Sequence, residues 1–514
     1  MNLDQPTDKE KIIYSNKQYF DASIRIAKRL FEEELYEDCI NYIQKTACFG
    51  WFNFSGYYKS EQLEILLAKI QQKILPSSSH PKKNNKNNKV LHICSEVHVS
   101  GGHSKLLYNW IKNDTSKKHS ILSTRLSADD LKAVSETYFE DISDIEFFSV
   151  KSNSKIESVK LLNEQPLNDY EVIILHIHPD ETITNIVFSQ KGITAPVWFI
   201  NHADHVFWLG TSIIDIVLQI RESNAAVDEE RRGISAERQF FLPIPVENKG
   251  ELNEETINDK IDKKINILST GTSYKFNPNE KYNFLQEAYK IVEENPEVVF
   301  NIVGLRQDSD YAKKYEHQRI ILHGGVSAST LASIEKNTHI YVEGFPMASF
   351  TALLQTALRK VPFVLHYDPL PLFKLFSEHQ EYAIIYPKNL QEWHYDLKKL
   401  IRDQKYRIET LQRQYEYISN NFSIAVWKTR VANLYQQNNA QTHAFWQPTS
   451  DAYYNDDNEK LLVTIDKRRL SHYDFTEKLS IRGKYFVYLM SKSRNANINY
   501  GGRKKLLGYF FNKQ

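Results

Sequence analysis

The chain has 514 residues and a formal net charge of +1, from 65 Lys and Arg against 64 Asp and Glu. This length is too great for one hydrophobic core and predicts two or three domains, and the balanced charge gives no general attraction to nucleic acid. Three scattered cysteines, Cys39, Cys48 and Cys94, exclude a disulfide framework and a zinc site. A polar N-terminus without an apolar run near the ~20 residues that span a bilayer completes the expectation of a cytoplasmic protein.

The N-terminal part of the sequence, residues 1–79, is expected to form a helical cap. Apolar residues such as Ile26 and Leu30, and later Leu63, Leu67 and Ile70, recur at the three- and four-residue spacing of one helix face. The next ten residues, 80–89, read HPKKNNKNNK and offer no apolar side chain to a core. They are therefore predicted to be a linker.

Residues 90–246 show the alternation of strands and helices that is typical of a doubly wound domain. The first strand is followed by Gly101 and Gly102, and glycine lets the backbone approach a ligand closely because it has no Cβ. A simple tight turn is the alternative interpretation of this pair. The predicted strands cover residues 90–94, 121–124, 145–150, 172–176, 197–201 and 216–220.

Histidines gather after two of these strands. His202 and His205 follow the strand that ends at residue 201, where an imidazole can hold an acceptor hydroxyl or take its proton. We favour His205 over His202, and a structural corner in which they only cap carbonyl groups is the alternative. His176 and His178 lie near the same predicted edge, but no carboxylate or cysteine has ligand spacing to them, so no metal is expected.

A polar segment, 247–264, leads to a second α/β domain over residues 265–440. Its first strand ends before Gly271, and Lys275 then presents a positive charge that could stabilise a departing diphosphate. A solvated surface lysine is the alternative. Predicted strands cover 265–270, 298–303, 320–323, 339–342 and 363–366, and predicted helices cover 282–294, 328–336 and 350–359.

The segment from residue 341 to residue 365 is typical of an anion site. Glu343 lies just past a predicted strand, and Ser349, Phe350 and Thr351 open a helix whose free N–H groups and positive dipole end suit a phosphate. Gln355 lies on the same helix, beside its apolar stripe.

These residues carry a resemblance to two-domain nucleotide-sugar glycosyltransferases. The run E-x-F-P…T…Q-x-x-L…V-P from Glu343 to Pro362 resembles D-x-F-P…T…D-x-L…G-V-P of O-linked N-acetylglucosamine transferases, and Glu-Gly-Phe resembles the first half of the E-x7-E element of family-4-like (glycosyltransferase group 1) enzymes. Tyr274-Lys275 is similar to their Tyr-Lys-x-x-Pro element. The histidine loop, residues 201–210, which carries His202 and His205, is similar to their His-Asp or His-x-x-(Tyr/Phe)-Trp-Leu patch. Gln355 stands where these families usually place a carboxylate.

The resemblance implies a GT-B fold, in which two Rossmann-like domains face a crevice, and metal-independent transfer of a sugar from a UDP- or GDP-linked donor to a hydroxyl of a glycan, a lipid-linked glycan or a protein. A bacterial surface polysaccharide or glycoconjugate is the expected product, and the nucleotide sugar is a co-substrate, with no cofactor. The resemblance leaves open whether the anomeric configuration of the sugar is retained or inverted. The implied contacts are Lys275, Gly271, Ser349, Phe350 and Thr351 to the diphosphate, Glu343 to the sugar, Gln355 to the ribose, His205 or His202 to the acceptor, and Gly101 and Gly102 to donor or acceptor.

Two other functions stay open on the sequence. The first is that of a non-catalytic homologue that binds glycan or stabilises a partner enzyme, which Gln355 supports. The second is that of a nucleotide-sugar epimerase of the same fold.

The C-terminal extension, residues 441–514, has thirteen Lys and Arg against three Asp and Glu from Lys460 onward, interleaved with aromatic residues. This composition suits an anionic membrane surface, and a subdomain packed on the core is the equal alternative. Nucleic acid is not an expected partner, because no binding module accompanies the basic residues. Removal of residues 445–514 is expected to leave the rest folded.

Overall fold

A computed structural model describes residues 7–75, 88–98, 102–190, 192–247, 264–308, 310–437, 451–465 and 475–492. The chain forms two compact units. Unit 1 consists of Met1–Ile220, Asn224–Phe241 and Leu434–Gln514, and unit 2 consists of Arg221–Ser223 and Leu242–Asn433. Most of the two expected linkers, 80–89 and 247–264, lies outside the described residues, and so does Gly101.

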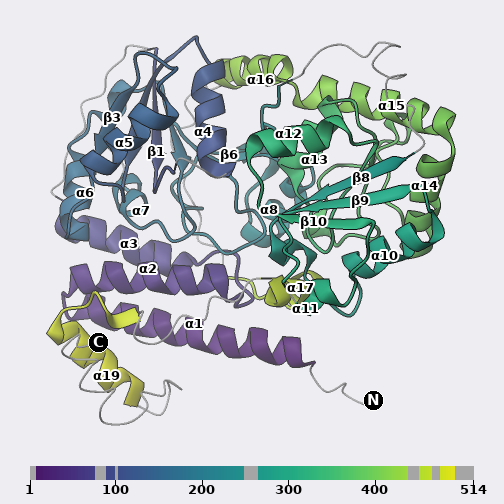
Figure 1. Cartoon of the computed structure of the whole chain (residues 1–514). Coiled ribbons are helices and arrows are strands. Elements are labelled where there is room, and N and C mark those ends of the chain that lie inside the picture. The colour runs from purple at the N-terminus through teal and green to yellow at the C-terminus, as the bar shows by residue number, and fades with distance from the viewer. Residues whose placement is uncertain are drawn as a thin grey trace. The chain divides into compact units, whose positions relative to one another are not determined.

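Unit 1 is built on a parallel sheet, of which Figure 1 labels β1, β3 and β6. Its seven strands have the order β3-β2-β1-β4-β5-β6-β7. The direction of the strand order changes between β1 and β4, and in such sheets ligands bind at the carboxyl ends of the strands beside this point. Every residue of β4 and β5 is buried, as expected for a parallel sheet with helices on both faces. The strands are β1 Lys89–Cys94, β2 Lys118–Ser123, β3 Glu146–Ser149, β4 Val172–His176, β5 Val197–Asn201, β6 Ile216–Gln219 and β7 Gln239–Phe241.

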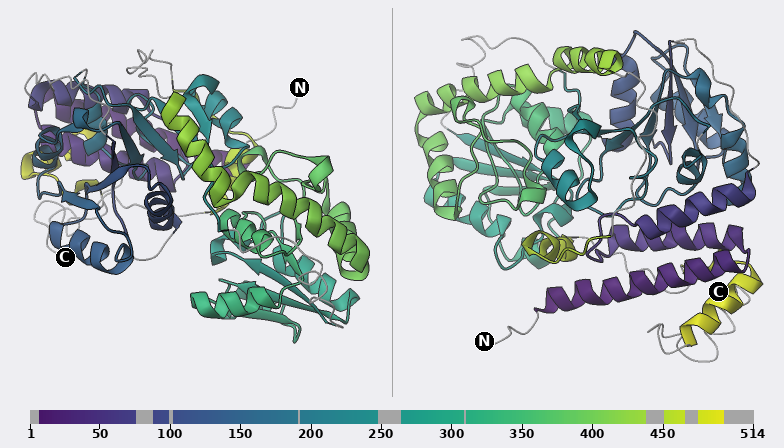
Figure 2. Two further views of the ribbon diagram at one scale, coloured as in Figure 1. Left: turned by 90° about the horizontal axis from the view of Figure 1, so that it is seen from above. Right: turned by 180° about the vertical axis from the view of Figure 1, so that it is seen from behind.

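Ten helices of the described residues lie wholly in unit 1. The first begins with a capping box, in which Thr7 accepts from the backbone N–H of Glu10 and the Glu10 side chain accepts from Thr7. Helices α1, α2 and α3 lie together along one side of the unit (Figure 2). The helices are α1 Asp8–Glu32, α2 Tyr36–Phe52, α3 Glu61–Ile74, α4 Gly102–Asn113, α5 Ala128–Tyr138, α6 Lys155–Asn163, α7 Ile183–Phe188, α8 Asn224–Arg232, α17 Asp457–Ile465 and α19 Ile481–Lys492.

The N-terminal helices share one hydrophobic core with the sheet. Phe20 of α1 and Leu67 of α3 are fully buried in the same cluster as Leu175 of β4. The carboxylate of Glu64 in α3 accepts from the backbone N–H groups of Gly210, Thr211 and Ser212 at 2.8–3.1 Å. This arrangement fixes the loop that follows β5, so the helices support that loop as well as the sheet.

The described parts of the C-terminal extension, residues 451–465 and 475–492, also belong to the fold of unit 1. Tyr58 donates to Glu459 of α17 at 2.7 Å, and the ring of Phe475 lies 5.3 Å from that of Tyr19 and 5.5 Å from that of Tyr42. These contacts show that the described part of this segment packs on the core, and they do not address its outer surface. Removal of residues 445–514 would expose part of the core, so this packing argues against the expectation that the rest stays folded.

Unit 2 contains a five-stranded parallel sheet in the order β10-β9-β8-β11-β12. Asn283 caps α10, Ser327 caps α12 and Asp403 caps α15 by accepting from backbone N–H groups in the first turn. The elements are β8 Ile265–Thr270, α10 Phe284–Glu294, β9 Val298–Val303, α11 Asp310–Lys313, β10 Ile320–Gly324, α12 Ala328–Lys336, β11 Ile340–Val342, α13 Phe350–Leu358, β12 Phe363–Val364, α14 Leu390–Arg402, α15 Gln404–Phe422 and α16 Ile424–Gln437, whose last residues, from Leu434, are counted with unit 1.

Candidate functional site

In unit 2, the predicted anion-binding residues come together at the carboxyl ends of β8 and β11. A Cβ added to Gly271 would lie 3.0 Å from Ser349 Oγ and 3.2 Å from the ring of Phe276, which is closer than ordinary packing. Gly304 has a φ of +96°, and a Cβ there would collide with the carbonyl of Gly271. Gly304 therefore requires glycine, whereas Gly271 leaves little room for a side chain, and this close packing brings the loop after β8 against the start of α13.

Lys275 lies in a 3-10 turn, Ser273–Phe276, directly after β8. Its Nζ donates to the carbonyl of Ala348 at 2.9 Å and to Ser349 Oγ at 3.4 Å. Burial, followed by the positive charge of Arg221, lowers the pKa of Lys275 to about 8. The lysine is thus held at the N-terminal end of α13, still charged at neutral pH.

The first turn of α13 supplies the second element of this site. Ser349 is its N-cap residue and makes no side-chain capping bond, and the first N–H groups of any helix lack partners inside it. Thr351 and Gln355 are half-buried. The ring of Phe350 packs against Phe376 and Phe422, at centroid distances of 5.6 and 5.8 Å, so its side chain serves the core.

Glu343 follows β11 and is buried, with 1% of its surface exposed. Its Oε2 accepts from the backbone N–H of His366 at 2.6 Å, whereas its buried Oε1 has no hydrogen-bond partner. Burial raises the pKa of Glu343 to about 8, although the His366 N–H and the charge of Arg221 oppose the shift. The group is therefore a neutral carboxylic acid at pH 7, which can donate as well as accept a hydrogen bond.

Arg221 is a cation of unit 2 that the sequence did not single out. It is 8% exposed, and its guanidinium donates to the carbonyl groups of Lys374 at 2.9 Å and Leu372 at 3.1 Å. Its charge acts on both Lys275 and Glu343. The site therefore combines two cations, a helix N-terminus and a protonated carboxyl group.

In unit 1, the two predicted histidines follow β5, as expected. His202 Nδ1 contacts the carbonyl oxygen of Ile200 at 3.2 Å. A carbonyl only accepts, so Nδ1 carries the proton and the lone pair is on Nε2. Burial, then the charge of His178, lowers the pKa of His202 to about 4. His202 is therefore a neutral imidazole.

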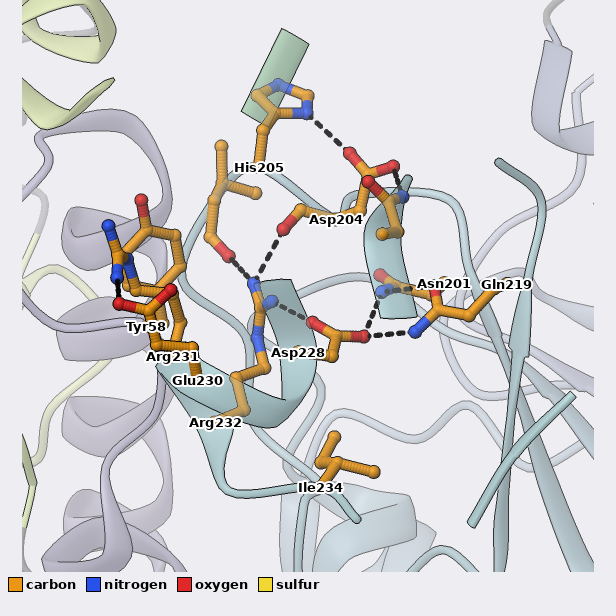
Figure 3. Close-up of polar contacts among 12 residues, drawn as sticks. Tyr58, Asn201, Asp204, His205, Gln219, Asp228, Glu230, Arg231, Arg232 and Ile234 are labelled. Carbon is orange, nitrogen blue, oxygen red and sulfur yellow. Dashed lines mark hydrogen bonds and ion pairs between the residues drawn. The ribbon is translucent and has the colours of Figure 1, made fainter. Parts of the chain in front are cut away.

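His205 is half-buried and lies against an acid. Its Nδ1 is 3.1 Å from Oδ1 of Asp204, while the other carboxylate oxygen of Asp204 accepts from the side-chain amide of Asn224 (Figure 3). In the neutral imidazole, a bond from Nδ1–H to the carboxylate leaves the lone pair on Nε2. The arrangement is that of a base whose ring is oriented by a carboxylate.

The loop that carries His205 is held by a buried ion pair between Arg232 and Asp228, which lie one helical turn apart on α8 (Figure 3). Arg232 donates to the carbonyl groups of Asp204 at 2.9 Å and of Val206 at 2.6 Å. Asp228 Oδ2 accepts from the side-chain amides of Asn201 at the end of β5 and Gln219 at the end of β6, both at 2.6 Å. The ion pair thus joins α8, two strand ends and the histidine loop.

A chain of three imidazoles lies inside the sheet of unit 1. His119 Nε2 contacts the carbonyl oxygen of Asp114 at 2.8 Å, His119 Nδ1 contacts His92 Nε2 at 3.0 Å, and His92 Nδ1 contacts His176 Nε2 at 3.0 Å. Burial lowers the pKa of all three, so each is neutral. Because the carbonyl can only accept, each ring must carry its proton on Nε2. His176 is therefore part of the sheet interior.

The remaining predicted residues are less informative. Gly102 is the first residue of α4, and Gly101 lies outside the described residues. His178 is half-buried, 5.7 Å from the ring of Trp51. Over the described ranges, no group of three histidine, cysteine or acidic side chains could hold a metal ion, and no helix is long and apolar enough to cross a membrane.

Comparison with known proteins gives a fold. No protein-family model matches the sequence, and no curated protein matches it significantly. Among solved structures, a mutant O-GlcNAc transferase of Thermobaculum terrenum is similar over 82% of this chain and 82% of its own, with 11% identity and a TM-score of 0.50. TarM is similar over 68% of this chain and 98% of its own, with 12% identity and a TM-score of 0.50.

These neighbours are GT-B glycosyltransferases, and their likeness, together with the two parallel sheets, confirms the expected GT-B fold. The apo form of the lipopolysaccharide outer core galactosyltransferase WaaB is also similar, with 16% identity, a TM-score of 0.48 and coverage of 68% of this chain and 99% of its own. At such identities the likeness establishes the fold alone.

Proposed function

We propose that the protein is a glycosyltransferase that moves a sugar from a nucleotide-diphosphate donor to a hydroxyl of a glycan, lipid-linked glycan or protein. The observation that carries the proposal is the position of Lys275, whose ammonium group is held 3.4 Å from Ser349 at the N-terminal end of α13. A cation and a helix N-terminus together form a site for a diphosphate. Arg221 adds a second positive charge to this neighbourhood.

In the proposed reaction, the bond between the anomeric carbon and the diphosphate oxygen breaks, and the diphosphate leaves with the electron pair. Lys275, Arg221 and the N–H groups of α13 would stabilise the charge that grows on this leaving group, so no metal ion is assigned to the step. Glu343, neutral at pH 7, would hold a sugar hydroxyl, and Gln355 would contact the ribose.

The acceptor hydroxyl would bind near His205 in unit 1. Its oxygen forms the new bond to the anomeric carbon, and its proton passes to Nε2 of His205, whose ring Asp204 orients through Nδ1. His202 is the second acceptor-side contact, as a neutral hydrogen-bonding group.

To test the proposal, the protein is incubated with UDP- and GDP-sugars and a mixture of glycan and lipid-linked acceptors. Free nucleoside diphosphate and new glycoside are then measured. A transferase releases nucleoside diphosphate in step with new glycoside. An epimerase would instead yield an isomer of the nucleotide sugar. A non-catalytic homologue, which the glutamine at position 355 supports, would bind a glycan or the donor without producing either compound.

A further inference from the structure

Helix α19 carries apolar side chains on opposite faces. On the inner face, Val487 is fully buried in the core of unit 1, and Phe486 and Met490 pack against the same core. On the outer face, Ile481 is 70% exposed, Tyr485 50% and Leu489 43%. These three residues, which we call the α19 stripe, follow one another at the four-residue spacing of one helix face.

The outward position of the α19 stripe is enforced by the way the helix docks. The carboxylate of Asp38 in α2 accepts from the backbone N–H of Ser480 at 2.6 Å. A Cβ on Gly483 would lie 2.5 Å from Asp38, so the backbone of α19 is in close contact with α2 at this turn. The helix therefore cannot roll to bury Ile481 and Tyr485 without losing these contacts.

Exposure of this kind is concentrated on α19. The described residues expose ten large apolar side chains, and three of them lie on this one helix of 12 residues. Single exposed apolar residues are ordinary on a protein surface, whereas a continuous row on one helix indicates a surface that something covers.

The charges beside the α19 stripe indicate what covers it. Lys478 and Arg482 are exposed, and Arg482 reaches Glu33 only at 3.5 Å. The nearby acid Glu477 is paired with Lys45 at 3.0 Å, and Asp38 is buried under the helix. In sequence, Lys460–Gln514 has a cationic excess of ten, from thirteen basic and three acidic residues. The surface thus presents apolar and cationic groups together.

We infer that the α19 stripe is a docking surface for an anionic lipid bilayer, with Ile481, Tyr485 and Leu489 inserted between the headgroups and Lys478 and Arg482 beside the lipid phosphates. Interfacial helices combine apolar or aromatic anchors with Lys and Arg in this way. A protein interface would instead deplete lysine at its centre. The inference does not depend on the proposed transferase activity.

The test is co-flotation of the full chain with vesicles of phosphatidylserine and phosphatidylcholine, and with vesicles of phosphatidylcholine alone. The wild type should bind the anionic vesicles at low salt and lose binding at ~0.5 M salt, where the screening length is only a few ångström. The variant Ile481→Ser/Tyr485→Ser/Leu489→Ser should bind at least tenfold less. A matched control, Ile12→Ser/Tyr14→Ser/Ile385→Ser, removes three similarly exposed apolar groups and should bind as the wild type does.

Because all six substituted side chains are exposed, unchanged circular dichroism and melting temperature are expected for both variants. Failure of the wild type to bind anionic vesicles at low salt would overturn the inference, and so would equal binding by the stripe variant. Sedimentation velocity tests the alternative that a second copy of the chain covers the α19 stripe. If the stripe variant loses self-association and vesicle binding is unaffected, α19 is an interface between two copies of the chain and the lipid assignment is wrong.

Discussion

The buried charged side chains at the carboxyl edges of the two sheets differ in the partners that hold them. In unit 1 the buried charges near the strand ends include two ion pairs: Arg232 with Asp228, and Arg125 with Asp180 at 2.9 Å. In unit 2, Lys275 is held by neutral oxygens, and an acid that burial keeps protonated, Glu343, lies in the same neighbourhood as Arg221.

The difference suggests that the two units have different roles in binding substrates. Matched buried charges fix the backbone of the histidine loop, which then needs no ligand to be stable. A buried cation such as Lys275, which neutral oxygens hold, is costly to keep in place and is best explained by an anion that binds there. We therefore regard unit 2 as the donor-binding unit and unit 1 as a rigid support for acceptor-side groups, and the predictions below would separate the two roles.

The largest expected effect is on the stability of unit 1. Arg232→Met leaves the carboxylate of Asp228 buried without its cation, which typically costs about 3–5 kcal/mol. Denaturant unfolding should show the loss in the transition of unit 1. Arg306→Met is the matched control, because its ion pair with Asp308 is exposed and should contribute at most about 1 kcal/mol. Equal losses in the two variants would contradict a supporting role for the buried pair.

The next effect is on turnover. Lys275→Ala should lower kcat on the order of a hundredfold, or about 3 kcal/mol, because one preorganised charge is removed from the growing anion. Lys281→Ala is the control: it removes an exposed lysine of the same unit that pairs with Asp368 at 2.6 Å. Wild-type turnover in the Lys275 variant with an established donor and acceptor would show that the lysine does not contact the diphosphate.

A smaller effect is expected from the residue that orients His205. Asp204→Asn should lower kcat on the order of tenfold to a hundredfold, because the amide no longer fixes the proton on Nδ1. Nucleotide affinity, measured by calorimetry, should stay the same. Nitrogen-15 spectra of labelled histidine give an independent check, since the tautomer of His205 should change. An unchanged tautomer and rate would remove Asp204 from the mechanism.

The smallest effect concerns pH and Glu343. Its pKa is raised from 4.5 to about 8 in the folded chain, so folding takes up a proton between these values and stability falls as pH rises from 4.5 to 8. Glu343→Gln removes this contribution. Between pH 6 and pH 7 the wild type should lose about 1 kcal/mol more than the variant in the free energy of unfolding of unit 2. Parallel pH curves would mean that Glu343 is ionised in the folded state.

Much of the fold could be predicted from the sequence, because buried parallel strands are short apolar runs with polar boundaries. The strands Val172–His176, Val197–Asn201 and Val298–Val303 have the predicted bounds. The edge strand β7, Gln239–Phe241, escaped prediction because three half-buried residues give no apolar run. The shared core of the N-terminal and C-terminal segments also escaped, since it depends on contacts between residues over 400 positions apart.

The candidate site was predictable where motif and position agree. Gly271, Lys275 and Ser349 lie together, as the strand-turn-helix pattern indicates. Arg221 could not be found in this way, because it lies in a three-residue segment, Arg221–Ser223, that belongs to unit 2 although its neighbours in sequence belong to unit 1. Asp204 beside His205 was visible in sequence, but its bond to Nδ1 depends on how Asn224 and Arg232 hold the loop.

The most direct test of the donor site is calorimetry of UDP and GDP binding at pH 7 and pH 9, with the wild type and Lys275→Arg. Lys275 is charged below its pKa of about 8 and loses its charge as pH rises through that value. One of the nucleotides should bind the wild type about tenfold more weakly at pH 9 than at pH 7, whereas the arginine variant, charged at both values, should show no such loss. Binding that is independent of pH in the wild type, or no binding of either nucleotide, would contradict the assignment of unit 2 as the donor-binding unit.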